Sequence, residues 1–236
     1  MSIWNKTYRV LNQDVNMFQN MRTSRLMELL QEACIAHTED LGMGREKTLD
    51  QGILWVVLQQ NVQITRIPSY DDQITIETWP GDTMHVLFPR FFDILDQNGN
   101  VMLEGSSLWA LIDAKTRKMI FPDRYGISIT GDYAKESPAL PKPIHRADTD
   151  QKRLFTVPFS YCDLNSHMNN TKYFDLAEDT IKAISEGRKL SSVTTEYASE
   201  ATFRETLTIS WKEEQNSCYL SGDTDKNCFR IHMTFD

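Results

Sequence analysis

The spacing of apolar residues predicts that the first half of the chain begins with a short strand and a long helix. Residues 3–10 alternate in the manner of a strand. Apolar side chains then recur at helical spacing from Leu26 to His37, and Gly42 stands where a left-handed helix C-cap is expected. From Ile53 the period changes to two, which is typical of antiparallel strands.

A β-hairpin is the clearest local signal among these strands. The apolar runs 86–95 and 101–112 flank the pair Asn98-Gly99, and both residues tolerate the positive φ that a tight hairpin turn requires. Periodicity then fades over residues 113–151, where prolines accumulate. This segment is interpreted as a linker or crossover.

The same order of elements recurs in the second half. A strand is expected at residues 154–158, and the helix after it carries Phe174, Ala177, Ile181 and Ile184 on one face. Further strands are expected at residues 193–203, 207–211, 218–222 and 228–235. The repeated order indicates an internal duplication.

Short strings of residues also match between the halves. Residues 14–16, Asp-Val-Asn, match residues 163–165, Asp-Leu-Asn, and at this offset Phe18 stands opposite His167. Each string leads into a predicted helix, which makes a chance match less convincing. The first half therefore has an apolar residue where the second has an imidazole.

A second match involves two predicted strands. Residues 74–76 match residues 207–209, and at this offset Ile67 stands opposite Glu200. Chance similarity between short strand-like strings is the alternative explanation. If the halves are homologous, the second half carries the ionisable groups while the first shapes a pocket.

The economical architecture for this pattern is α+β. Each half would be a long helix wrapped by a curved antiparallel sheet, with the two sheets joined edge to edge, which is a tandem double hotdog. The expected division is an N-terminal hotdog at residues 1–114 that shapes a pocket, a linker at 115–151 and a C-terminal hotdog at 152–236 that carries the ionisable groups.

Composition narrows the classes of function. The formal net charge of −8 argues against nucleic acid or an anionic membrane as the main partner, because both would be repelled. No apolar run approaches the roughly 20 residues of a membrane helix, and no signal-peptide pattern begins the chain. The four cysteines lack metal-ligand spacing. A reduced cytoplasmic protein without metal or membrane insertion is expected.

A polar segment before the second helix is the strongest candidate site. In an extended chain Asp163, Asn165 and His167 point to one side, so they could converge on one substrate atom. The alternative is a polar turn that caps the helix, because Asp and Asn are common in caps and turns. A histidine beside a helix start is also often only structural.

The segment resembles the signature of the acyl-acyl carrier protein thioesterases. That family's Asp-x-Asn-x-His-x-Asn-Asn-x-x-Tyr pattern is matched by Asp163, Asn165, His167, Asn169, Asn170 and Tyr173. Similar stretches in the first half are residues 29–33, 66–68 and 74–79. The resemblance spans nearly the whole chain.

The resemblance implies a thioester hydrolase that releases free fatty acid from acyl carrier protein in fatty acid biosynthesis, without a cofactor. It also implies a catalytic set of Asp163, Asn165, His167 and Glu200, with the glutamate on a following strand. Family members often have a cysteine after this glutamate, whereas this chain has Ala201. A cysteine nucleophile is therefore not expected. The transit peptide of plastid members is missing, which suggests a bacterial-type cytosolic enzyme.

Roles follow from the chemistry of thioester hydrolysis, which needs a base, a positioned water and donors to the oxyanion. Glu200 is expected to act as base or nucleophile, and His167 to assist proton transfer to the thiolate. Asp163 would orient His167. Asn165 would hold water or substrate. The oxyanion donors are expected at the helix start, from N–H groups near Asn169 and Asn170.

The carrier and its acyl chain need their own contacts. A basic patch for the acidic carrier, which bears the acyl chain on 4'-phosphopantetheine, is expected among Lys142, Arg146, Lys152, Arg153 and Lys172. A merely solvated linker explains these residues equally well. The acyl pocket is expected to include Met17, Met21, Trp55 and Leu58, although most of them could be plain core.

Other readings of the same sequence stay open. An acyl-CoA thioesterase or a hotdog dehydratase would use a similar site on another substrate. A non-catalytic acyl-binding protein would hold the ligand without hydrolysis, but it would not need four acid, base and amide groups. Chain-length preference and assembly into a homodimer are not determined by the sequence.

Overall fold

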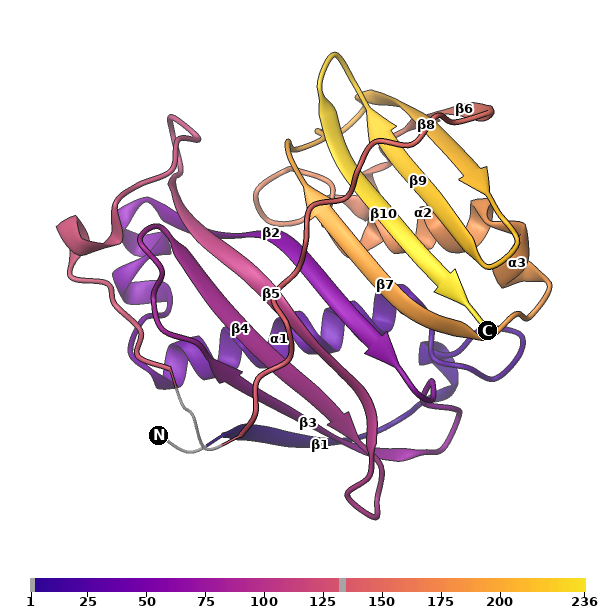
Figure 1. Cartoon of the computed structure of the whole chain (residues 1–236). Coiled ribbons are helices and arrows are strands. Elements are labelled where there is room, and N and C mark those ends of the chain that lie inside the picture. The colour runs from indigo at the N-terminus through magenta and orange to yellow at the C-terminus, as the bar shows by residue number, and fades with distance from the viewer. Residues whose placement is uncertain (1–2, 132–134) are drawn as a thin grey trace.

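In the computed structural model, which describes residues 3–131 and 135–236, one antiparallel sheet runs through both halves (Figure 1). Its strand order is β1-β3-β4-β5-β2-β7-β10-β9-β8-β6. The strands are β1 Trp4–Arg9, β2 Ile53–Ile64, β3 Gln73–Pro80, β4 Leu87–Leu95, β5 Val101–Asp113, β6 Gln151–Thr156, β7 Leu190–Tyr197, β8 Thr206–Glu213, β9 Ser217–Asp223 and β10 Asn227–Phe235. The helices are α1 Thr23–Asp40, α2 Lys172–Thr180 and α3 Lys182–Ser185.

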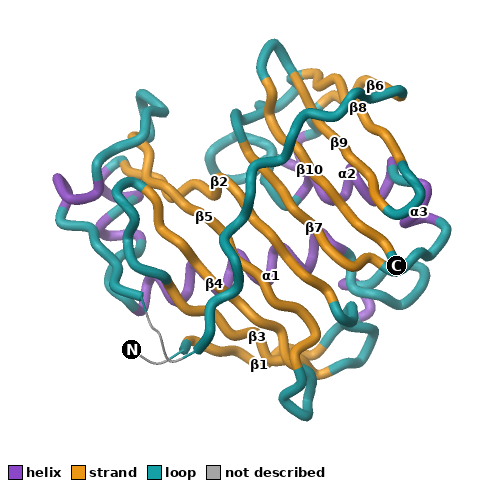
Figure 2. Tube along the Cα trace, in the orientation of Figure 1, coloured by secondary structure: helices purple, strands orange, loops and turns teal. Residues whose placement is uncertain are grey.

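The helices lie against one face of the sheet, and a chain segment crosses the other face (Figures 1 and 2). The segment is residues 135–150, within the predicted linker. It is attached by Lys135, whose Nζ lies 2.8 Å from Glu77 and also pairs with Asp93, and by a 2.6 Å hydrogen bond from Ser106 to the carbonyl of Ala139. Because the sheet is continuous, the boundaries at residues 114 and 151 stay a prediction.

The two halves meet where β2 pairs with β7. The pairing is antiparallel and runs from Gln59 opposite Glu196 to Gln63 opposite Ser192. At its middle, Thr194 lies opposite Asn61 and donates a hydrogen bond to the Asn61 Oδ1 at 3.0 Å. The offset that places Ile67 opposite Glu200 also places Asn61 opposite Thr194, so equivalent residues of the two halves pair with each other. The predicted edge-to-edge joining of the sheets is therefore present.

The second helix is shorter than its pattern predicts. Ile181 adopts an extended conformation with ψ of 116°, which ends α2 and lets α3 begin at Lys182. The carboxylate of Glu213 accepts hydrogen bonds from the N–H groups of Lys182 and Ala183 at 3.1 Å. These bonds satisfy the donors that the break exposes, so a strand side chain stabilises the interruption.

The backbone also corrects the first match between the halves. The N–H of Asn16 donates to the carbonyl of Asn20, and the N–H of Asp163 donates to that of His167, in the same way. The bridges Val15–Met21 and Cys162–Met168 repeat this pattern. The structural counterpart of His167 is therefore Asn20, and the predicted pairing with Phe18 is wrong by two residues. A similar Asp-x-Asn string two residues out of register produced the error.

The second match is supported by backbone contacts. The N–H of Met21 donates to Pro68 O, and the N–H of Met168 donates to Ala201 O, both at 2.7 Å. Ile67 and Glu200 precede these two acceptors, so they occupy equivalent places. The helix-start loops of the two halves are thus built alike, and they differ in their side chains.

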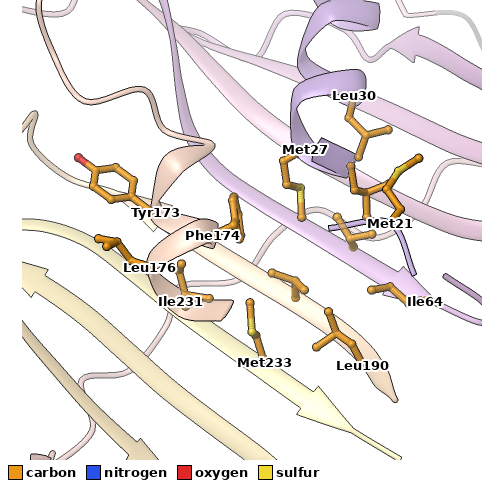
Figure 3. Close-up of a cluster of buried hydrophobic side chains, with 14 of the residues drawn as sticks. Met21, Met27, Leu30, Ile64, Tyr173, Phe174, Leu176, Leu190, Ile231 and Met233 are labelled. Atoms are coloured by element: carbon orange, nitrogen blue, oxygen red, sulfur yellow. The ribbon is translucent and has the colours of Figure 1, made fainter. Parts of the chain in front are cut away.

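The larger of two buried hydrophobic clusters among the described residues joins the halves. Its buried side chains include Met27 and Leu30 of α1, Phe174 of α2 and Met233 of β10 (Figure 3). Burial of side chains of this size contributes roughly 1.5–3 kcal/mol each. The halves therefore share most of their apolar stabilisation and are not expected to unfold independently.

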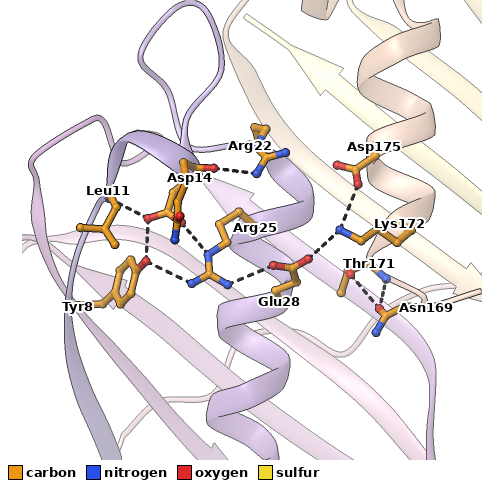
Figure 4. Close-up of polar contacts among 11 residues, drawn as sticks. Tyr8, Leu11, Asp14, Arg22, Arg25, Glu28, Asn169, Thr171, Lys172 and Asp175 are labelled. Carbon is orange, nitrogen blue, oxygen red and sulfur yellow. Dashed lines mark hydrogen bonds and ion pairs between the residues drawn. The ribbon is translucent and has the colours of Figure 1, made fainter. Parts of the chain in front are cut away.

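A chain of ion pairs connects α1 to α2 beside this core (Figure 4). Arg25 pairs with Asp14 at 2.9 Å and with Glu28 at 3.1 Å. Lys172 then pairs with Glu28 at 3.1 Å and with Asp175 at 3.3 Å. The alternating charges compensate one another along the helix contact.

The start of α1 depends on the other half. Arg22 occupies the N-cap position and makes no side-chain cap hydrogen bond. Instead the N–H of Thr23 donates to the carboxylate Oε1 of Glu178 on α2 at 2.5 Å. Burial raises the pKa of Glu178, and the hydrogen bond from Thr23 opposes this shift. A cap supplied across the interface fixes the two helices relative to each other.

Replacing Glu178 with Ala is expected to lower the free energy of unfolding by about 1–2 kcal/mol, because it leaves a buried helix-start donor without an acceptor. Glu178→Gln keeps an oxygen in place and should retain most of the stability. Urea unfolding at constant m-value measures both. An equal loss in the two variants would show that the charge of Glu178, and not the cap, is what matters.

Candidate active site

The loop that carries the predicted site is shaped by Asp163. Its Oδ1 accepts hydrogen bonds from the N–H of Asn165 at 2.8 Å and from that of His167 at 3.4 Å. Ser166 takes a left-handed conformation with φ of 65°, which reverses the chain. The carboxylate therefore bonds to backbone donors, and the direct contact with the His167 ring that was predicted is not among the described hydrogen bonds.

The first half contains the same turn with an amide in place of the acid. Asn16 Oδ1 accepts from the N–H of Phe18 at 3.0 Å and from that of Asn20 at 3.2 Å. Asn16 is thus the counterpart of Asp163, and Phe18 that of Asn165. Turn formation needs only the side-chain oxygen, so the negative charge of Asp163 is the feature that distinguishes the second half.

His167 and Glu200 are brought together by the second loop. His167 Nε2 lies 3.5 Å from Glu200 Oε2, and their side chains are 22% and 38% exposed. An isolated bridge between His167 and Thr202 holds the two segments side by side. The predicted convergence of an imidazole and a carboxylate is therefore present, at a separation slightly longer than a direct hydrogen bond.

Glu200 lies in a loop and not on a strand. The predicted strand 193–203 ends at Tyr197, because the N–H groups of Ala198 and Ser199 both donate to the carbonyl of Cys228, at 2.9 and 3.3 Å. This shared acceptor breaks the strand register. The chain then leaves the sheet, which carries the Glu200 side chain toward His167.

Arg117 is a third charged group at this place, and the sequence did not identify it. Its guanidinium forms an ion pair with the Glu200 carboxylate from a turn that follows β5. Its backbone adopts φ of 58°, at a turn position where glycine is usual. No sequence signal names Glu200 as its partner, since the contact joins residues far apart in the chain.

The environment of His167 favours the neutral imidazole. Burial lowers its pKa, the charge of Arg117 lowers it further, and Asp163 and Glu205 act in the opposite direction. Nδ1 is buried and has no hydrogen-bond partner within residues 3–131 and 135–236. Nε2 is the nitrogen directed at Glu200.

Two cavities flank the loop. The first has a volume of about 230 Å³ and is lined mainly by apolar side chains, among them Ile53, Trp55, Phe88 and Ile129. Trp55 and Phe88 pack edge to face at 4.7 Å. Leu164 and Asn165 of the loop also line this cavity. Asn165 therefore faces the apolar cavity, although the sequence pattern placed it beside His167.

One wall of the first cavity is charged. Arg90 is 4% exposed, lies 2.8 Å from His37 Nδ1 and donates to Thr38 Oγ1 at 2.8 Å. Burial lowers the pKa of Arg90. The ion pairs found between described residues include no carboxylate for it. A polar atom of a ligand could therefore gain a hydrogen bond on this wall.

The second cavity is an open cleft of about 560 Å³ between the halves. It contains His167 and Glu200 from one half, and Leu58 and Arg117 from the other. The loop of residues 163–167 separates the cleft from the apolar cavity. A substrate with an apolar arm and a polar arm could place its reactive bond at this loop.

The four residues predicted to line the acyl pocket lie in different places. Trp55 lines the apolar cavity and Leu58 lines the cleft. Met21 belongs to the buried core at 3% exposure, and Met17 is 85% exposed. Met17 lies at the tip of the turn capped by Asn16, which points it to solvent, so its assignment to the pocket is wrong.

The predicted oxyanion donors are only partly available. The N–H of Asn169 already donates to Tyr161 O at 2.8 Å. Its side-chain oxygen accepts from Thr171 N–H at 2.9 Å, just before α2 begins. The backbone N–H of Asn169 is therefore already paired in this arrangement, and the oxyanion roles of Asn169 and Asn170 stay predictions.

The predicted carrier patch is scattered in the structure. Lys142 lines one hollow of the surface, whereas Arg146 and Lys152 line another. Arg153 donates to Thr180 at 2.6 Å, and Lys172 is neutralised by Glu28 and Asp175. None of the five lines either cavity beside the loop.

The described part of the chain contains neither a metal-ligand cluster nor a membrane-spanning helix. No group of three or more His, Cys, Asp or Glu side chains there could hold a metal ion. No helix there has the length and apolarity needed to cross a membrane.

Two family models match the chain. They are the acyl-ACP thioesterase N-terminal domain over residues 2–123 and the acyl-ACP thioesterase C-terminal domain over residues 144–235. A chloroplastic acyl-[acyl-carrier-protein] hydrolase of Cuphea viscosissima is 24% identical over 214 residues, which is 84% of this chain and 52% of that relative. The chain spans about half the length of the curated relatives it matches.

Solved structures show the same fold. An acyl-ACP thioesterase from Bacteroides thetaiotaomicron has a TM-score of 0.86 at 19% identity and covers 99% of this chain and 98% of its own. A 12:0-ACP thioesterase from Umbellularia californica has a TM-score of 0.80 at 20% identity, with 99% and 97% covered. The predicted tandem double hotdog is confirmed.

Asp163→Asn should leave the fold intact, because Asn16 makes the same turn in the first half. The pKa of His167 is expected to fall further, since a neighbouring negative charge is lost. Thermal unfolding and an NMR titration of the His167 ring measure the two effects. An unchanged titration would limit Asp163 to turn formation, and a large loss of stability would contradict the equivalence with Asn16.

Proposed function

This chain belongs to the acyl-ACP thioesterase family, and from this premise we propose that it hydrolyses the thioester of an acyl chain carried on acyl carrier protein. The products would be a free fatty acid and the carrier with its 4'-phosphopantetheine thiol. The observation that supports this best is the imidazole–carboxylate pair of His167 and Glu200, in a cleft next to an apolar cavity.

The two cavities suggest how the substrate is placed. The acyl chain would occupy the apolar cavity beside Trp55, and the pantetheine arm would occupy the cleft that contains Glu200. The thioester carbonyl would then lie at the loop of residues 163–167. Asn165, which faces the apolar cavity, would donate its amide to the substrate on the acyl side.

The reaction would use His167 Nε2 and Glu200 Oε2, which lie 3.5 Å apart. A water bonded to this pair from the cleft would lose a proton to one of the two groups and attack the thioester carbon. The C–S bond of the tetrahedral intermediate would break, and the same proton would pass to the departing thiolate. The neutral state of His167 suits this step, because an imidazole that is already protonated cannot accept a proton.

The cellular setting is part of the proposal. Release of acyl chains from the carrier would end their elongation in fatty acid biosynthesis. A bacterial-type cytoplasmic enzyme is proposed, whereas the curated relatives are chloroplastic by name.

Incubation with acyl-carrier thioesters of graded chain length is expected to release free acids. Glu200→Gln and His167→Gln should each lower the turnover by about 100-fold or more, as expected when a general acid or base is removed. Mass spectrometry of the released acids measures reaction and chain preference together. Near-normal turnover by either folded variant would refute the assigned pair.

Cys162→Ser is the matched control for this experiment. Cys162 is half-buried near the loop, and its Sγ contacts the carbonyl of Pro158 at 3.7 Å. Its replacement should leave turnover unchanged. Parallel assays with acyl-CoA distinguish a CoA thioesterase, and stoichiometric acyl binding without release would indicate a non-catalytic protein.

Phe88→Ala should shift the preference toward longer acyl chains, because it enlarges the apolar cavity beside Trp55. Phe92→Ala is the control, since Phe92 lies on the same strand but packs in the main core. Both changes are expected to cost about 3–5 kcal/mol of stability at most. Competition between chain lengths in one reaction measures the preference. Equal profiles for the two variants would place the acyl chain elsewhere.

A further inference from the structure

The turn after β5 is built to present Arg117. Asp113 Oδ1 accepts from the N–H groups of Lys115 and Thr116 at 3.1 and 2.6 Å. The N–H of Arg117 donates to Asp113 O at 2.9 Å, and the N–H of Asp113 donates to Lys118 O at 2.9 Å. These bonds hold Arg117 at φ of 58°. That conformation costs roughly 1–2 kcal/mol for a residue with a side chain.

The strained residue reaches across the interface between the halves. Its guanidinium pairs with Glu200. Its Nε is buried and has no hydrogen-bond partner within the described ranges. The first half has Ile67 at the place equivalent to Glu200, so an arginine there would have no acid to meet. The contact is specific to the half that carries the imidazole.

We propose that Arg117 is a positioning residue, which holds the Glu200 carboxylate against His167 Nε2 through its ion pair across the cleft. This inference rests on the proposed hydrolysis for its effect on rate. A planar guanidinium restricts the orientation of a carboxylate more than an ammonium group does. Glu200 would then face the imidazole in one rotamer and not swing into solvent.

The positive charge of Arg117 also lowers the pKa of His167. The charged groups that face the cleft are Arg117, Glu200, Glu205, Asp225 and Lys226. Burial and Arg117 lower the pKa of His167, whereas Asp163 and Glu205 raise it. Removing Arg117 takes away the cation that lowers the pKa of His167, so His167 would be protonated at higher pH. The acid limb of turnover would move upward with it.

Arg117→Gly is the sharpest variant, because glycine accepts positive φ without a steric cost. The variant should be at least as stable as the parent, which removes misfolding as an explanation. Its kcat is expected to fall about tenfold or more with a smaller change in KM, and its acid limb should shift up by about half a unit or more. Arg117→Lys should restore the acid limb but not the full kcat.

Lys118→Gln is the control in the same turn. Lys118 is exposed and does not line the cleft. Its replacement removes one positive charge, as Arg117→Gly does, but away from Glu200. Its kcat and pH profile should match the parent enzyme. An unmoved acid limb in Arg117→Gly, or an equal shift in Lys118→Gln, would overturn the proposal.

An NMR titration of the His167 ring separates this inference from the proposed function. The ring signal is assigned by its loss in His167→Gln, and it should titrate at higher pH in Arg117→Gly than in the parent. This result would support the coupling even if no thioester were hydrolysed. An unchanged titration would overturn the proposal even in an active enzyme.

Discussion

The pairing of β2 with β7 is the constraint on which the rest of the structure depends. It joins two curved half-sheets through a short antiparallel ladder centred on Asn61 and Thr194. Because strand pairing fixes both direction and register, the loops at the ends of these strands have fixed places relative to each other. The cleft with His167 and Glu200 therefore forms between the halves and belongs to neither alone.

The duplication is informative because the two loop systems are alike in backbone and different in charge. Asn16 and Asp163 cap the same turn, and Asn20 occupies the place of His167. The turn alone thus explains why an oxygen-bearing side chain is needed there. It does not explain the negative charge of Asp163. That charge raises the pKa of the nearby His167, and the first half has no imidazole at the equivalent place.

Two residues of one short loop in the site face different cavities. Asn165 faces an apolar cavity, and two residues later His167 faces a polar cleft. Alternation in an extended chain would have put both side chains on the same side, but the left-handed Ser166 reverses the chain between them. The loop can therefore contact both arms of a substrate while its own backbone stays fixed by Asp163 and by the bond from Met168 to Ala201.

The sequence by itself determined the α+β class and the duplicated order of elements, because both follow from periodicity and repetition. The pairing of His167 with Glu200 was predicted from the resemblance to a known family. The tertiary structure alone decided the offset of the repeat, the facing of Asn165, and the partnership of Arg117 with Glu200. Contacts between segments far apart in the chain depend on sheet register and loop direction, and single-sequence spacing carries no record of either.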